Sequence, residues 1–206
     1  MEIQIIETCC NTPATKTAWV KKGAFKPLSK QVAGIERRTY RTGVVTSKLG
    51  VVALIDIHGF HPTTVQFLDS LAEKGFQVSA IDLFLNGPMP DEYMGDMAKL
   101  DDWIRTKAEY TNNHIGELVK ISAQDLTADG CESLFIIGHC WGVHLAIRAA
   151  SEAGQVFLGR GDWIIPEQNE AAAQVLQKMS EFFSTLTQKK GTQPICICIF
   201  REQPKP

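Results

Sequence analysis

A Gly-His-Cys-Trp-Gly sequence at residues 138–142 is the stretch of this chain most suited to chemistry. A cysteine thiolate can attack a carbonyl carbon, and Cys140 lies at the centre of the stretch. Glycines two residues before and two after a central residue are typical of a nucleophile elbow, a turn so tight that a side chain at Gly138 or Gly142 would collide with the neighbouring strand or helix. Because a buried cysteine is more commonly a small hydrophobic residue, the interpretation depends on the flanking elements.

The flanking sequence predicts the strand and the helix that an elbow requires. Residues 133–137 form a short apolar run, typical of a strand that is buried on both faces, and residues 143–150 predict a helix. The N-terminus of this helix carries partial positive charge, which favours the thiolate form of Cys140. The backbone N–H of Trp141 would then point to where an oxyanion forms.

The rest of the chain alternates between predicted strands and helices. The predicted strands cover residues 36–45, 51–57, 76–82, 155–158 and 193–200, and the predicted helices cover 63–74, 96–109, 112–128 and 167–186. Residues 1–34 are expected to lie across the surface with one or two short strands, and the charges of 36–45 suggest an edge strand. The alternation indicates a single α/β domain, residues 1–206, with a mostly parallel sheet and helices on both faces.

Ligands of parallel sheets bind at the carboxyl ends of the strands, and four such ends carry polar residues. They are 56–59 (Asp-Ile-His-Gly), 82–87 (Asp-Leu-Phe-Leu-Asn-Gly), the elbow, and 159–162 (Gly-Arg-Gly-Asp). The last follows the nucleophile in chain order, as the acid of an α/β-hydrolase does, so Asp162 is the candidate acid. The alternative is that Asp162 only caps a turn or a helix.

Composition excludes several classes of protein. The chain has 206 residues, 44% hydrophobic and 21% charged, with a net charge of −2, as expected of a soluble globular protein. Its basic residues are scattered, which argues against nucleic-acid binding, and no apolar run reaches the ~20 residues that span a membrane. No secretory signal is visible, and the six cysteines are poorly spaced for disulfides or zinc, so we expect reduced thiols in the cytoplasm. The first predicted strand–helix unit has no glycine-rich phosphate loop, which argues against a nucleotide-binding protein.

Taken together, these motifs resemble the dienelactone hydrolase family, in particular its eukaryotic, fungal-type branch. The resemblance lies in residues 138–142 and 56–59, in Ile-Asp-Leu-Phe at 81–84, and in 159–162 with the following Pro166; Cys-Cys-Asn-Thr-Pro at 9–13 is also similar. It implies an α/β-hydrolase fold that hydrolyses small ester, lactone or thioester substrates through an acyl-enzyme. It implies no metal and no organic cofactor, and we expect a monomer or homodimer.

The resemblance also implies roles for individual residues. Cys140 matches the nucleophile and Asp162 the acid of the triad. The backbone N–H groups of Ile57 and Trp141 match the oxyanion hole. Asp56 stands where family members keep a glutamate that influences activation of the thiol, and it is one methylene shorter.

Two positions near the expected substrate pocket bear on what the protein binds. Asn86 stands near the arginine that holds the substrate carboxylate in bacterial members, and it has no charge, so a neutral ester, lactone or thioester is as plausible as dienelactone. His58 also lies at this sheet edge and lines the expected pocket.

The chain departs from the family at the triad base. Family members carry a histidine after the acid, beyond the last strand, whereas the five histidines here (58, 61, 114, 139 and 144) all precede Asp162. His58 and His61 are the candidates to replace it, and the His139 side chain is expected to point away from the pocket.

A second departure is the direct join at residues 153–155, where family members insert a strand and a loop. We therefore expect the sheet to lack one strand–loop segment, as in a splice form or a flawed gene model. The two departures leave open an alternative, a catalytically inactive relative or a fragment that acts as a binding protein, and they predict poor esterase activity.

Overall fold

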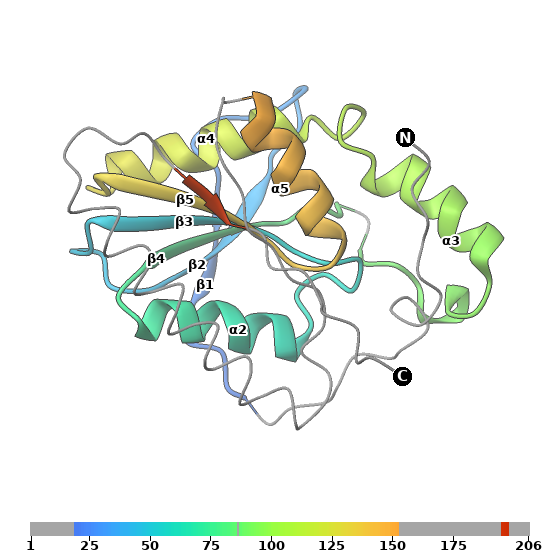
Figure 1. The fold of residues 1–206 in the computed structure, drawn as a ribbon, viewed down its shortest axis with the longest axis horizontal. Coiled ribbons are helices and arrows are strands. Elements are labelled where there is room, and N and C mark those ends of the chain that lie inside the picture. The colour runs from blue at the N-terminus through green and yellow to red at the C-terminus, as the bar shows by residue number, and fades with distance from the viewer. Residues whose placement is uncertain (1–18, 86, 153–194, 198–206) are drawn as a thin grey trace, which may run out of the picture.

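The computed structural model describes residues 19–85, 87–152 and 195–197, and these residues build a mixed six-stranded sheet (Figure 1). The strands are β1 (Ala24–Pro27), β2 (Arg38–Thr42), β3 (Leu49–Leu54), β4 (Gln77–Ile81), β5 (Ser133–Gly138) and β6 (Ile195–Ile197). Their order across the sheet is β1-β2-β4-β3-β5-β6. The pairs β4–β3, β3–β5 and β5–β6 are parallel, and only β1–β2 and β2–β4 are antiparallel.

Helices cover both faces of the sheet, as the alternating pattern predicts. The described helices are α2 (Pro62–Glu73), α3 (Met97–Trp103), α4 (Ile115–Ala128) and α5 (Trp141–Glu152), with a 3₁₀ turn η1 (Asp91–Tyr93) and a π-helical turn η2 (Ile104–Ala108). Figure 1 shows α2 on one face and α4 and α5 on the other. The fold is therefore that of an α/β protein with a mostly parallel sheet. None of the helices in the described ranges is both long and apolar enough to cross a membrane.

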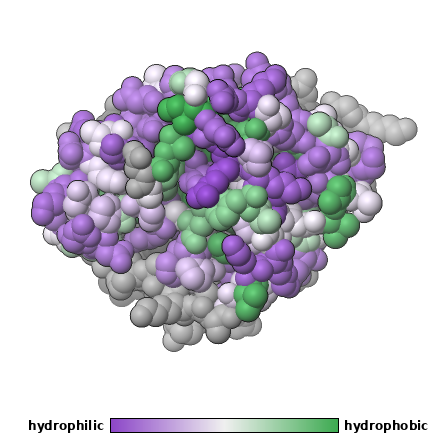
Figure 2. Space-filling model, turned by 180° about the vertical axis from the view of Figure 1, so that it is seen from behind, coloured by the Kyte–Doolittle hydropathy of each residue, from purple (hydrophilic) through white to green (hydrophobic). Residues whose placement is uncertain are grey.

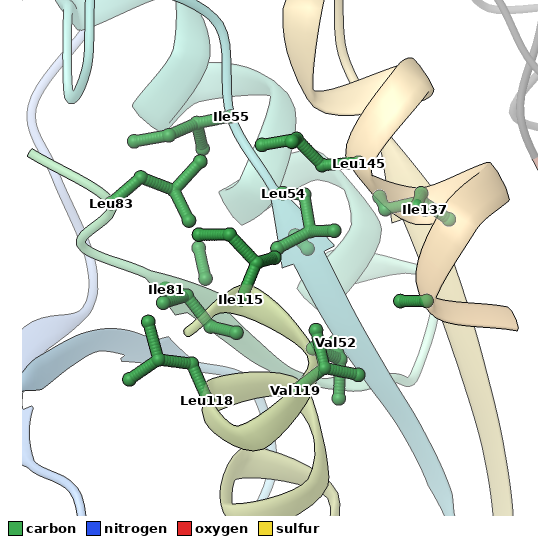
Figure 3. Close-up of a cluster of buried hydrophobic side chains, with 14 of the residues drawn as sticks. Val52, Leu54, Ile55, Ile81, Leu83, Ile115, Leu118, Val119, Ile137 and Leu145 are labelled. Carbon is green, nitrogen blue, oxygen red and sulfur yellow. The ribbon is translucent and has the colours of Figure 1, made fainter. Parts of the chain in front are cut away.

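The core lies around β3, the central strand. Val51, Val52, Ala53 and Leu54 are all buried. Figure 3 shows side chains of β3 and α4 packing against each other, with Leu145 of α5 beside them. A continuous apolar run suits such a strand because helices cover both of its faces.

The chain order reverses beside β3, and this creates the position for a site. The chain leaves β3 through α2 to reach β4 on one side, and returns through α3 and α4 to β5 on the other. Crossover connections therefore diverge at the carboxyl end of β3, which leaves a crevice there in open parallel sheets. Asp56 follows β3 and Cys140 follows β5 at this point.

The structure contradicts the prediction that the charged early strand lies at an edge. β2 pairs with both β1 and β4, so it lies inside the sheet and β1 is the outer strand. Its arginines are matched by carboxylates, since Arg38 Nε lies 2.7 Å from Asp82 Oδ2 and Arg41 pairs with Asp129. The charged residues of β2 therefore did not mark an edge strand, because carboxylates from other segments of the chain pair with them.

Several element boundaries also differ from the sequence prediction. β3 ends at Leu54 instead of reaching Ile57, because Asp56 Oδ1 accepts the His58 N–H at 2.8 Å and turns the chain. α4 begins at Ile115 because His114 adopts a left-handed conformation with φ of 55°. The helix predicted for 96–109 becomes α3 followed by η2.

The C-terminal strand predicted for 193–200 is confirmed over Ile195–Ile197, where β6 pairs with β5. The predicted strand 155–158, the helix 167–186 and the join at 153–155 lie outside the described residues. The missing strand–loop segment therefore stays a prediction.

Candidate active site

Cys140 lies at the turn between β5 and α5, in the strand–turn–helix arrangement that its motif predicts. Its φ is 50°, in the left-handed region that residues with a side chain seldom adopt. That conformation costs an L-residue roughly 1–2 kcal/mol. The turn places Cys140 directly before Trp141, the first residue of α5, where the helix dipole favours negative charge.

The two glycines of the motif are required by close approach. A Cβ atom at Gly142 would collide with the carbonyl group of Leu54 and would lie 2.8 Å from the carbonyl oxygen of Ile55. A Cβ atom at Gly138 would collide with the backbone of Gly142 and Val143. The expectation that neither position tolerates a side chain is confirmed, since backbone atoms cannot move aside as a flexible side chain can.

Asp56 connects the loop after β3 to the elbow. Its Oδ2 lies 2.9 Å from His139 Nδ1 and 3.4 Å from Thr64 Oγ1, while Oδ1 accepts the His58 N–H. A carboxylate can only accept, so Nδ1 of His139 carries the proton of the short contact. The side chains of Asp56 and His139 are 7% and 16% exposed, so this pair is shielded from water.

The two amide groups assigned to the oxyanion hole lie beside this pair in the chain. Ile57 follows Asp56, and its carbonyl accepts the Met89 N–H at 2.8 Å. Trp141 follows Cys140 at the start of α5. Neither amide N–H is a donor in the backbone hydrogen bonds that the described turns and loops make outside the helices and strands.

The remaining histidines have different environments. His61 caps α2, because its Nδ1 accepts the Thr63 N–H at 3.4 Å and lies 3.0 Å from Thr63 Oγ1. Burial lowers the pKa of His61 below its ordinary value, an effect that the nearby Asp56 partly opposes. His58 is half-buried on the loop after β3. His144 lies on α5, where its ring packs against Trp141 at a tilt of 40° with a centroid distance of 5.1 Å.

Trp141 also ties the elbow to the segment between β4 and α4. Its Nε1 donates a hydrogen bond of 3.0 Å to the carbonyl oxygen of Ala108, the last residue of the π-helical turn η2. Earlier in the same segment, Trp103 packs on Phe84 with ring centroids 5.0 Å apart. The segment between β4 and α4 therefore contacts Trp141, the residue after the candidate nucleophile. π-Helical turns such as η2 recur at functional sites.

The structure brings together two of the predicted segments, the loop that follows β3 and the elbow that follows β5, through the contact between Asp56 and His139. Asp162 and Asn86 lie outside the described residues, so their positions stay predictions. Within the described ranges, no group of three or more potential ligands could hold a metal ion. The sequence interpretation missed the contacts Asp56–His139 and Trp141–Ala108. The first could have been inferred from the parallel register, which pairs Leu54 with Gly138 and so brings the next residues of both strands together.

Comparison with known proteins points to one family. The profile described as the dienelactone hydrolase family matches residues 38–158. A Klebsiella pneumoniae structure assigned as a dienelactone hydrolase is 14% identical with a TM-score of 0.53, covering 88% of this chain and 86% of that one. A dienelactone hydrolase-like promiscuous phosphotriesterase from metagenomic libraries is 12% identical with a TM-score of 0.49, covering 87% and 82%. No curated protein matches the chain. At such identities the first structure supports the α/β-hydrolase fold alone, and the family follows from the profile.

Proposed function

Because the chain belongs to the dienelactone hydrolase family, hydrolases of ester and lactone bonds, we propose that Cys140 is its nucleophile and that its substrates are small esters, lactones or thioesters. One observation carries the proposal. Cys140 occupies a left-handed turn between a parallel strand and a helix N-terminus, with glycines closely packed on either side. Strained backbone of this kind clusters at active sites.

The proposed reaction is acyl transfer in two steps. The base takes the proton of the Cys140 thiol, and the thiolate attacks the carbonyl carbon to form the C–S bond. The bond from that carbon to the substrate's alcohol oxygen or thiol sulfur breaks, and the base returns the proton to this leaving group, which in a lactone stays attached to the acyl group. The N–H groups of Ile57 and Trp141 hold the oxyanion. Water then hydrolyses the thioester and regenerates Cys140, with Asp162 as the acid that orients the base. Because Asn86 has no charge, we infer that the acyl group is neutral.

Of the two histidines in the loop after β3, His58 and His61, we infer that His58 is the general base that accepts the Cys140 proton. His61 accepts a hydrogen bond at Nδ1 as the cap of α2, so its other nitrogen Nε2 carries the ring proton and cannot take another. His58 has no such capping role. General-base catalysis contributes about 10²–10⁴-fold. We expect His58→Gln to slow p-nitrophenyl acetate turnover by roughly 100-fold or more, and His61→Asn, which keeps a capping side chain, to change it little.

The proposed function is tested by comparing the protein with Cys140→Ala and Cys140→Ser. Release of p-nitrophenolate from p-nitrophenyl acetate should fall to the uncatalysed rate in Cys140→Ala, whose melting temperature serves as the control for folding. Cys140→Ser should retain little activity, since a serine hydroxyl needs a stronger base than a thiol does. Equal turnover by the protein and Cys140→Ala would overturn the proposal and would favour a non-catalytic binding role.

A further inference from the structure

The hydrogen bond between Asp56 and His139 joins the two chain segments that carry the proposed oxyanion donors. Asp56 lies one residue before Ile57, and His139 lies two residues before Trp141. Each residue thus belongs to the same short turn as one donor. Both side chains are shielded from water, so their hydrogen bond does not compete strongly with solvent.

Backbone contacts also join these two segments at the end of β3. The His139 N–H donates to the carbonyl oxygen of Leu54 at 2.9 Å, and Gly142 packs against the carbonyls of Leu54 and Ile55. They fix the end of β3 relative to the elbow. The turn from Asp56 to Gly59 follows these contacts, and within it the Asp56 side chain is bonded to His139 of the elbow.

Asp56 also controls the shape of its own turn. Its Oδ1 accepts the His58 N–H at 2.8 Å, and its carbonyl oxygen accepts the Gly59 N–H at 3.1 Å. The peptide group between Asp56 and Ile57 therefore follows the orientation of the Asp56 side chain, which His139 holds from the other segment. Moving His139 would rotate the Ile57 N–H relative to Trp141.

We propose that Asp56 and His139 are a positioning pair that sets the relative placement of the Ile57 and Trp141 N–H groups for oxyanion binding. This inference rests on the proposed function. It differs from a role in thiol activation, in which Asp56 would alter the charge of Cys140. It also differs from a purely structural role, in which the bond would only stabilise the fold.

Two reactions of the same thiol separate these roles. Acylation of Cys140 by p-nitrophenyl acetate passes through an oxyanion, whereas alkylation by iodoacetamide displaces iodide at a saturated carbon and forms none. Both reactions need the thiolate. A defect in the oxyanion hole therefore slows acylation alone, and a defect in thiolate formation slows both.

The decisive variants are His139→Phe and His139→Asn, with thermal melts of each. Phenylalanine keeps a ring without a donor, and the amide nitrogen of asparagine can replace Nδ1. We expect acylation to fall roughly 10- to 100-fold in His139→Phe, as misplacement of a catalytic group by about 1 Å does, and to recover largely in His139→Asn. The alkylation rate should stay within about twofold of the parent in both variants.

Three results would overturn the inference: equal losses of acylation and alkylation, acylation unchanged in His139→Phe, or no recovery in His139→Asn. If His139→Phe does not fold, Asp56→Leu takes its place. Leucine has no acceptor for the His139 ring, so positioning predicts that acylation falls at least about tenfold while alkylation stays within about twofold of the parent, and equal losses of both rates would contradict it. A parent protein that is alkylated at Cys140 but never acylated would overturn the proposed function before any variant is compared.

Discussion

The reactivity of a cysteine depends on its environment, and two cysteines of this chain lie in opposite ones. Cys140 lies at a helix N-terminus in a strained turn. Cys131 is 4% exposed beneath the loop before β3, and burial raises the pKa of its thiol above its ordinary value. The first environment favours a thiolate and the second opposes it.

We therefore predict that iodoacetamide alkylates Cys140 at least about tenfold faster than Cys131 at pH 7, because alkylation requires the thiolate. Peptide mass spectrometry after brief labelling measures both rates in one sample. Denatured protein, in which the two thiols should react alike, is the control. Equal rates in the folded protein would contradict the elbow environment.

His61 offers a second test at the level of one residue. Its folded pKa is lowered from 6.5 by burial, so the unfolded chain binds a proton more readily than the folded one. The stability that comes from keeping His61 neutral is therefore fully present above about pH 6.5 and decreases as pH falls toward the lowered folded value.

We predict that His61→Asn loses less stability than the parent when pH falls from about 7 to about 5, since asparagine does not titrate but still caps α2. Urea unfolding at several pH values measures the difference. Parallel pH profiles for the two proteins would show that His61 does not contribute to the acid sensitivity.

At the scale of elements, β3, β5 and α5 meet closely at the elbow. Gly142 in α5 contacts the carbonyl groups of Leu54 and Ile55 at the end of β3, and Gly138 at the end of β5 contacts Gly142 in turn. These are contacts between backbones, which leave no flexible group to absorb an added atom. The approach of α5 to the sheet thus depends on the absence of side chains at both glycines.

We expect Gly142→Ala to destabilise the protein by about 1–3 kcal/mol or more, because the new Cβ must displace backbone. Cys140→Ala, two residues earlier, keeps the same backbone strain and should cost less. Thermal melts of the two variants decide the order. A Gly142→Ala protein as stable as Cys140→Ala would mean that α5 does not lie as close to β3 as described.

The π-helical turn η2 is also fixed to the elbow, through the Trp141 indole. We predict that Trp141→Phe, which keeps an aromatic ring but loses the donor to the Ala108 carbonyl, lowers stability by about 1 kcal/mol and speeds amide hydrogen exchange in residues 104–108. Exchange in α2, on the other face of the sheet, serves as the internal control. Unchanged exchange in 104–108 would show that this hydrogen bond does not hold the turn.

At the scale of the whole molecule, the sequence predicted the parallel sheet, the helices on both faces and the elbow, because apolar strands and glycine spacing are local signals. It did not predict the place of β2 inside the sheet, since the partners of Arg38 and Arg41 lie far away in sequence. The Asp56–His139 bond was missed for the same reason: it depends on the register of β3 and β5.

One face of the molecule is mainly polar. Figure 2 shows a face with mainly hydrophilic residues and smaller hydrophobic areas between them. The exposed large hydrophobic residues of the described ranges are Val20, Phe25, Ile35, Val44, Val45 and Leu85, of which Val44 and Val45 are adjacent. Exposed apolar residues in such numbers are ordinary on protein surfaces.

The central claim is that Cys140 becomes acylated by a small ester, and trapping the acyl-enzyme tests it most directly. The protein is mixed with p-nitrophenyl acetate, quenched in acid within seconds and analysed by intact-mass and peptide mass spectrometry, with Cys140→Ala treated in parallel. We predict one acetyl group per molecule, located on the peptide that contains Cys140 and missing from the variant. Acetylation at other residues alone, or equal labelling of the protein and Cys140→Ala, would contradict the assignment of Cys140 as the nucleophile.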